Sequence, residues 1–78
     1  MSAHSATEQD KRLLEALKAG PVTSIQASTH LDIVHPPSVV RRLRRRGHNI
    51  ITQWTYQATE PGRPPHRVGL YVLINEAA

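Results

Sequence analysis

The chain has 78 residues and a formal net charge of +4, with no cysteine and only three aromatic side chains. A chain this short forms one domain with a small core, and without cysteine it forms neither a disulfide nor a thiolate metal site. It lacks an apolar run near the roughly 18 residues of a membrane span. Its first five residues do not resemble a signal peptide, so we expect a protein of the cytoplasm that does not enter membranes.

Positive charge is concentrated in one segment. Five of the ten basic residues lie in the six positions 41–46, and without them five basic residues face six acidic ones, a net charge of −1. A positive field focused on one segment favours an anionic partner, because ordinary solvated surfaces mix both signs. A merely solvated helix face is the plainer alternative.

The N-terminal part predicts a tail and a first helix. We expect residues 1–6 to be a disordered tail, followed by one folded domain at residues 7–75. Apolar residues at helical spacing predict a helix to about Lys18, with the stripe Leu13, Leu14 and Leu17. Gly20-Pro21 ends this helix.

A second helix and a tight turn follow. Val22-Thr23 is a short extended link that suits one bridge of a sheet, and Thr23 or Ser24 caps a helix to about Leu31. Asp32 stands where the chain must turn, and Asp tolerates the left-handed conformation better than most other residues. Two short helices, a tight turn and a basic third helix predict a helix-turn-helix arrangement.

The third helix is predicted over residues 36–46, with Pro37 in its first turn and Gly47 at its end. At 100° per residue one side of this helix is apolar and the opposite side is polar. The apolar side carries Val39, Val40 and Leu43, and the polar side carries Ser38, Arg41 and Arg45. Arg42 and Arg44 flank the polar side, and Arg46 lies near the apolar edge.

After Gly47 the pattern changes to that of strands. Residues 50–57 and 67–74 are rich in β-branched and aromatic side chains and predict a hairpin. Its connection contains Glu60-Pro61-Gly62-Arg63, the signal of a type II turn. We expect Trp54 and Tyr56 to pack between the hairpin and the helices, although Ile50 and Ile51 leave the buried face of the first strand ambiguous.

The chain resembles the small winged helix-turn-helix domains of phage and prophage proteins. The motifs that carry the resemblance, over roughly residues 10–74, are Thr23-Ser24-Ile25-x-Ala27, Leu31-x-Ile33, His35-Pro36-Pro37, Leu43-Arg44-Arg45-Arg46-Gly47-His48-x-Ile50 and Tyr71-Val72-Leu73. The resemblance implies an α+β fold, a winged helix-turn-helix of three helices followed by a two-stranded β-hairpin wing. It also implies DNA binding. Family members often have Gly in the turn where this chain has Asp32.

This fold predicts a duplex DNA-binding protein whose third helix enters the major groove. The wing, residues 58–67, would then lie on the adjacent backbone or minor groove. Arg41 and Arg45 are predicted to read base edges, because a guanidinium matches the acceptor pair of guanine. The predicted DNA-binding residues are Ser38, Arg41, Arg42, Arg44, Arg45, Arg63 and Arg67, with Arg42 and Arg44 on phosphates and Ser38 on a phosphate or base.

Other chemistries have less support. The five histidines are scattered over the chain without the ligand spacing of a zinc site, so we expect no metal. The chain lacks paired catalytic carboxylates, a phosphate-binding glycine loop and a nucleophile elbow, so we expect neither an enzyme nor a cofactor. Three aromatic residues are few for a surface that stacks single-stranded bases.

The predicted role is transcriptional regulation, or an accessory task in recombination or replication, in a bacterial host cytoplasm. The sequence leaves open whether the chain acts as a homodimer on a palindromic site. The alternative is a phage protein-interaction module whose basic helix blocks an acidic surface of a host factor, such as a nuclease or polymerase. Double-stranded DNA requires the cations of helix and wing on one continuous face, and this requirement separates the two hypotheses.

Overall fold

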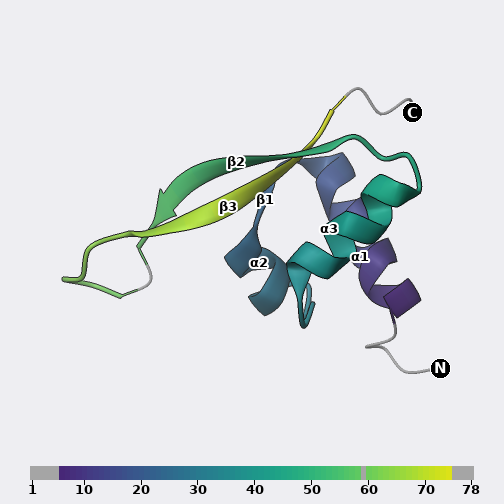
Figure 1. Cartoon of the computed structure of the whole chain (residues 1–78). Coiled ribbons are helices and arrows are strands. Elements are labelled where there is room, and N and C mark those ends of the chain that lie inside the picture. Colours follow the sequence, from purple (N-terminus) through teal and green to yellow (C-terminus); the bar gives the residue numbers. More distant parts are fainter. Residues whose placement is uncertain (1–5, 59, 75–78) are drawn as a thin grey trace.

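A computed structural model of the chain describes residues 6–58 and 60–74. These residues form, in order, α1 (Ala6–Ala19), β1 (Val22–Thr23), α2 (Ser24–Thr29), α3 (Pro36–Arg45), β2 (Ile50–Gln57) and β3 (His66–Leu73). The helices gather in one body, and the hairpin of β2 and β3 extends from it (Figure 1). The predicted order of helices followed by a hairpin is therefore confirmed. The predicted tail at residues 1–6 falls mostly outside the described residues, and Ala6 already belongs to α1.

The sheet has one strand more than the predicted hairpin. Among the described residues its order is β1-β3-β2, with both pairings antiparallel. The link Val22-Thr23 pairs with β3, so that Val22 stands opposite Tyr71 and Thr23 opposite Leu70. The two-stranded wing is thus corrected to a three-stranded sheet, because the short strand before α2 satisfies its backbone groups on the free edge of β3.

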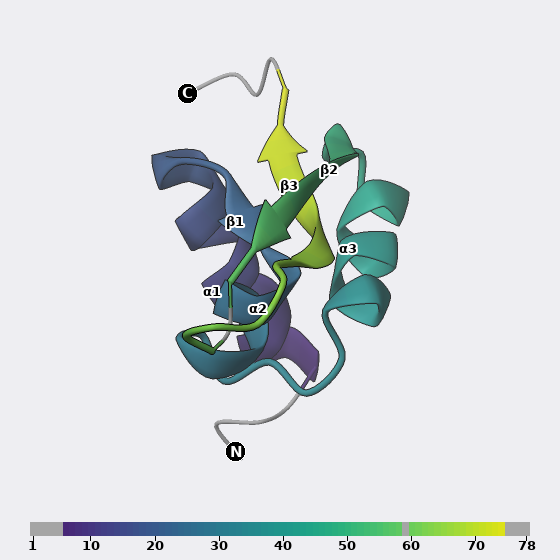
Figure 2. The ribbon, with the colours of Figure 1, turned by 90° about the vertical axis from the view of Figure 1, so that its left-hand side faces the viewer.

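The core lies between the helices and the inner end of the sheet. Leu13 of α1 and Leu43 of α3 are fully buried, and Ile33 in the turn is almost so. Ile50 of β2 and Tyr71 of β3 join the same cluster. Figure 2 shows α3 beside the hairpin and α1 with α2 on the other side, so this cluster fixes the hairpin relative to α3.

Local hydrogen bonds shape the helix-turn-helix. Thr23 caps α2 in a capping box with Gln26, and α2 ends at Thr29, two residues before the predicted end. Asp32 adopts the expected left-handed conformation with a φ of 54°. The guanidinium of Arg12 on α1 donates to the carbonyl of Leu31 at 2.7 Å and to that of Asp32 at 3.1 Å, which holds the turn against the first helix.

The end of α3 matches the prediction from Gly47. The helix ends at Arg45, one residue before the predicted end, and Gly47 has a φ of 97°. The backbone N–H of Gly47 donates to the carbonyl of Arg44, and that of His48 donates to the carbonyl of Leu43. These two bonds form a Schellman motif, which satisfies the last carbonyls of the helix and turns the chain into β2.

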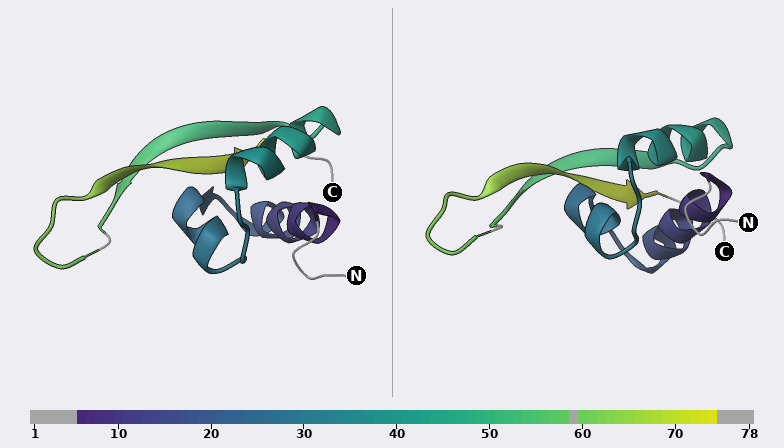
Figure 3. Two further views of the ribbon diagram at one scale, coloured as in Figure 1. Left: turned by 60° about the horizontal axis from the view of Figure 1, so that its bottom comes forward. Right: turned by 90° about the horizontal axis from the view of Figure 1, so that it is seen from below.

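The outer half of the hairpin differs from expectation. The turn is closed by a bond of 3.4 Å from the Arg63 N–H to the Glu60 carbonyl, and Gly62 has a φ of 78°, as a type II turn requires. However, Trp54 is 60% and Tyr56 71% exposed, so the prediction that they pack against the helices was wrong. An eight-residue strand is roughly 26 Å long at about 3.3 Å per residue, and its outer end passes beyond the helices (Figure 3).

None of the helices in the described part of the chain is long and apolar enough to cross a bilayer.

Candidate nucleic-acid interface

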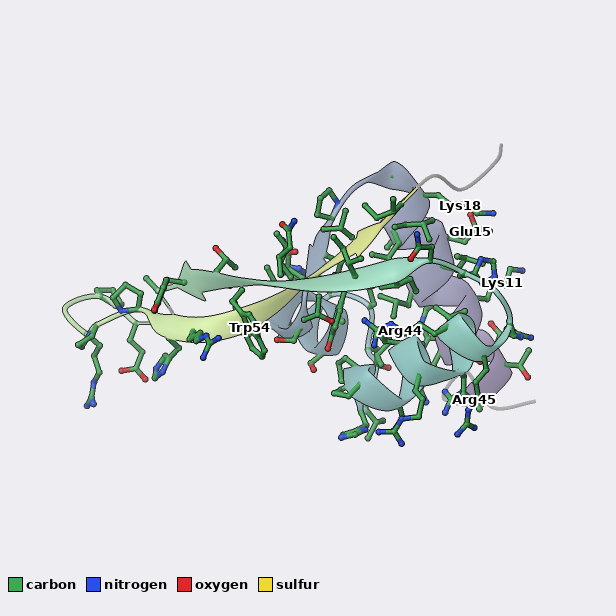
Figure 4. All side chains as sticks on the ribbon, turned by 45° about the horizontal axis from the view of Figure 1, so that its top comes forward. Lys11, Glu15, Lys18, Arg44, Arg45 and Trp54 are labelled. Atoms are coloured by element: carbon green, nitrogen blue, oxygen red, sulfur yellow. The ribbon has the colours of Figure 1, made fainter. Side chains whose placement is uncertain are left out.

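Helix α3 separates its apolar and polar sides as its sequence predicts. Val39, Val40 and Leu43 are buried, whereas Arg41 and Arg45 are exposed. Neither of these two arginines has a hydrogen bond or ion pair with another described residue. Arg45 lies on the side of α3 away from the sheet (Figure 4). Both guanidinium groups are therefore available to an anionic partner.

Ser38 lies at the start of α3 and is half-buried. Its hydroxyl is 2.6 Å from Nδ1 of His35, and its backbone N–H donates to the His35 carbonyl at 3.1 Å. His35, the N-cap residue, makes no side-chain cap bond of its own. A phosphate or base contact by the Ser38 hydroxyl would therefore share this oxygen with the imidazole of His35.

Arg42 is engaged within the protein. Its Nε and Nη2 atoms donate to both carboxylate oxygens of Asp10 on α1, at 2.7 to 3.1 Å, and Asp10 is 5% exposed. Arg46 adds a longer contact of 3.7 Å to the same carboxylate. The hydrogen bond to Asp10 raises the pKa of Arg42 above its ordinary value. Arg42 thus joins α3 to α1, a role that the phosphate prediction did not include.

A sequence signal for this pair existed. Asp10 precedes Leu13 by three residues and Leu17 by seven, which places its carboxylate on the buried side of α1. A buried carboxylate requires a cationic or hydrogen-bonding partner. The basic residues at the inner edge of α3 were the nearest source of one.

Arg44 connects α3 to the sheet. Its Nε donates to the Ile50 carbonyl at 2.8 Å, and its Nη2 donates to Oγ1 of Thr52 at 3.1 Å. Figure 4 shows the side chain between α3 and β2. These bonds use two of the five N–H donors that a guanidinium carries, and they hold the group in one orientation.

A groove of about 380 Å³ lies between α3 and the hairpin. Arg41 and Arg44 line it from α3, Thr52 and Trp54 from β2, and Tyr71 from β3. None of its lining residues, all within the described part of the chain, is acidic. Burial raises the pKa of Tyr71 above its ordinary value, and the nearby charge of Arg44 opposes this effect. The sequence did not predict this groove, because Trp54 was expected to fill the space.

The two wing arginines have different surroundings. The guanidinium carbon of Arg67 lies 4.3 Å from the centre of the Trp54 ring, which is a cation–π contact. Arg63 lies at the turn, where its Nε is 3.2 Å from a carboxylate oxygen of Glu60, and both side chains are largely exposed. Exposed pairs of this kind contribute little stability, so Arg63 can exchange Glu60 for another anion at small cost.

The structure therefore brings together some predicted residues and separates others. Arg41 and Arg44 line one groove, and Arg67 contacts Trp54, which also lines it. Arg42 faces α1, and Arg63 lies at the far turn of the hairpin. The groove thus brings together Arg41 and Arg44, with Arg67 next to its Trp54 wall, while Ser38, Arg42, Arg45 and Arg63 do not line it.

Comparison with known proteins is consistent with this arrangement. No curated protein matches the chain, and no solved structure does. A family model described as a winged helix-turn-helix domain matches residues 8–76, nearly the whole chain. A helix-turn-helix domain supports a DNA-binding role in general. The chain belongs to the winged helix-turn-helix family.

Proposed function

We propose that this protein binds duplex DNA, with α3 in the major groove and the wing on the adjacent backbone or minor groove. The observation that carries the proposal is the continuity of the cationic surface. Arg41 and Arg44 of α3 share a groove with Trp54, and Arg67 stacks on that ring, so Trp54 connects the cations of the helix with one of the hairpin. The rival hypothesis of an acidic protein partner does not require this continuity.

The arginines make different kinds of contact with DNA in this proposal. Arg41 and Arg45 read base edges, because they are exposed and carry no internal partner among the described residues. Arg44 contacts a phosphate with the donors that β2 leaves unused. Arg63 and Arg67 contact the backbone or a narrow minor groove, where negative potential favours arginine. Arg42 contributes mainly by holding α3 on α1.

The biological role that fits such a domain is regulation of transcription, or an accessory task in recombination or replication. The protein acts by binding rather than by catalysis in this proposal, and it works where bacterial DNA is found, in the cytoplasm. A homodimer would match two-fold symmetric DNA, since two recognition helices then read two half-sites.

The salt dependence of duplex binding tests the proposal. Each phosphate neutralised by an arginine releases counterions, so the logarithm of the binding constant falls against the logarithm of salt with a slope of about −0.9 per contact. With Arg44, Arg63 and Arg67 on the backbone, we expect a slope of roughly −3 for the native protein on a labelled duplex. Absence of duplex binding at low salt, or a slope near zero, would contradict the proposal and favour an acidic protein partner.

A further inference from the structure

We propose that the groove between α3 and the hairpin binds a single unpaired nucleotide, with the base on Trp54 and the phosphate between Arg41 and Arg44. This goes beyond duplex binding, because a base within a paired stack cannot place its face on a side chain. A free nucleotide and an unpaired nucleotide of a strand present the same groups to the groove. The inference therefore does not depend on the proposed duplex function.

The aromatic wall of the groove is held in place but not covered. Trp54 is 60% exposed and lines the groove, while Arg67, nearer the turn of the hairpin, stacks on its ring at 4.3 Å. Figure 4 shows the Trp54 side chain extending from the hairpin on the side where α3 lies. An aromatic ring held by one cation and exposed elsewhere is a surface on which a base can stack, a contact worth about 1–3 kcal/mol in single-strand binders.

Gly69 keeps space open beside this wall. It stands directly opposite Trp54 in the sheet, on the same face, and it lines the groove. Its φ is not in the left-handed region, and a Cβ atom added there would meet only the methyl group of Thr52 at 3.6 Å, an ordinary contact. Neither backbone conformation nor crowding therefore requires glycine here. A side chain at this position would instead occupy the groove, and glycine within a strand often marks the close approach of a ligand.

The cationic wall suits a phosphate. Arg41 is exposed with no partner among the described residues, while Arg44 is fixed in orientation by its two bonds to β2. One guanidinium is thus preorganised and the other is free to close on a bound group. With no acidic side chain lining the groove, a phosphate there meets no like charge.

Tyr71 supplies a polar group with no internal partner. The residue as a whole is 6% exposed and lines the groove, and its hydroxyl hydrogen-bonds to none of the described residues. No buried side-chain oxygen in the described part of the chain lacks a partner, so this hydroxyl is open to solvent and to a ligand. Placed beside Arg44, it can donate to a phosphate oxygen or to a sugar hydroxyl.

The size and chemistry of the groove together select the ligand. A volume of about 380 Å³ lies in the range of small-molecule sites, which begins at roughly 300 Å³. An aromatic face, two guanidinium groups and hydroxyl groups match an aromatic heterocycle that carries a phosphate. A phosphate alone would leave the Trp54 wall unused, and an apolar ligand would leave the arginines unpaired.

Trp54 is the only tryptophan of the chain, so its fluorescence reports directly on the groove. We would titrate the native protein with adenosine monophosphate, adenosine and inorganic phosphate. We would also titrate it with two duplexes of equal length, one fully paired and one with a single unpaired adenine. We expect stacking to quench the fluorescence with the monophosphate, or with the duplex that holds the unpaired base, in clear preference to the paired duplex.

Three variants locate the effect. Gly69→Val adds a side chain to the groove whose Cβ makes only an ordinary contact with Thr52, and it should weaken binding of the quenching ligand tenfold or more. Arg41→Ala and Tyr71→Phe should each weaken this binding severalfold. Lys18→Ala is the control, because it removes an exposed cation of α1 that lies outside both the groove and the proposed DNA surface. Circular dichroism and thermal unfolding of each variant establish that it remains folded.

Quenching by the monophosphate identifies a free nucleotide as a ligand, and quenching only by the unpaired base identifies a nucleotide of a strand. Either result supports the site if Gly69→Val abolishes it and Lys18→Ala does not. Equal quenching by inorganic phosphate, no quenching by any ligand, or equal effects of these two variants would overturn it. Binding of a labelled duplex, measured separately by anisotropy, shows whether the proposed duplex function stands when this inference fails.

Discussion

Helix α3 and the outer half of the β2–β3 hairpin use their conspicuous residues in opposite ways. The helix carries a run of arginines that looks like a ligand surface, yet Arg42 pairs with the buried Asp10 and Arg44 ties the helix to β2. The hairpin carries aromatic residues that look like core, yet Trp54 and Tyr56 are exposed. Cations thus stabilise the fold in one region, and aromatic rings form the surface in the other.

This difference shows that residue type does not determine a role until its neighbours are known. In α3, a carboxylate buried on α1 requires one of the arginines. In the hairpin, the strand continues past the helices, and Trp54 borders the groove beside α3 without being covered by it. The surface open to a partner is consequently smaller on the helix, and larger on the hairpin, than the arginine count suggests.

The largest expected effect is the loss of stability when the pair of Arg42 and Asp10 is broken. Arg42→Ala leaves the carboxylate of Asp10 buried without its main partner. Loss of one member of a buried pair costs about 3–5 kcal/mol, but the Arg42 side chain is 36% exposed and Arg46 remains nearby. We therefore expect the free energy of unfolding to fall by about 2 kcal/mol in urea titrations.

Two further variants test whether this loss of stability comes from the unpaired carboxylate. Arg45→Ala should change stability by no more than about 0.5 kcal/mol, as for other exposed positions. Replacing both partners, with Asp10→Leu and Arg42→Leu, should recover stability relative to Arg42→Leu alone, because no unpaired charge remains. Equal stabilities for Arg42→Ala and Arg45→Ala would mean that the pair contributes nothing to the fold.

The next effect concerns the hairpin. Gln57 and His66 are paired, so replacing residues 58–65 with Asn-Gly gives a two-residue hairpin turn on the same register. This variant keeps Trp54 and Arg67 but removes Arg63 and the proline-stiffened turn. We expect unchanged thermal unfolding and roughly tenfold weaker duplex binding at fixed salt, about 1.4 kcal/mol. Unchanged binding by the folded variant would remove the turn from the DNA surface.

A smaller effect on stability concerns Asp32 in the turn of the helix-turn-helix. Asp32 has a φ of 54°, a conformation in which glycine carries no Cβ penalty. The carbonyl that accepts from Arg12 is retained in Asp32→Gly. We expect this variant to be more stable by about 0.5 kcal/mol. The gain is smaller than the strain energy that it relieves, because glycine also increases the conformational entropy of the unfolded chain. A loss of stability would show that the Asp32 side chain contributes more than its backbone costs.

Much of the fold was predictable because local chemistry determines it. Gly47 ends α3, Pro61-Gly62 forms the type II turn, and Asp32 adopts the left-handed conformation, each for reasons contained within a few residues. The pairing of Val22 with Tyr71 joins positions far apart in the chain; the sequence indicated that the short segment suited one bridge of a sheet, but not which strand it would pair with.

The site was less predictable because its parts meet only in the folded chain. Helical periodicity correctly placed Arg41 and Arg45 on the exposed side of α3. Asp10, however, lies 32 residues from Arg42 in the sequence, so their pairing arises only in the tertiary structure. The groove depends on where Trp54 lies relative to α3, and alternation along a strand does not specify where the covering helices end. Gly69, opposite Trp54, was the one local indication of open space.

The most direct test of the central claim compares the free arginines with the paired one on DNA. Arg41→Ala, Arg45→Ala and Arg42→Ala are measured on a selected specific duplex and on a scrambled duplex, at a temperature where all three variants are folded. Arg41→Ala or Arg45→Ala should cost about 1–3 kcal/mol on the specific duplex and much less on the scrambled one, while Arg42→Ala should change both little. Equal losses on both duplexes for all three variants would contradict the account, because no base would then be read by α3.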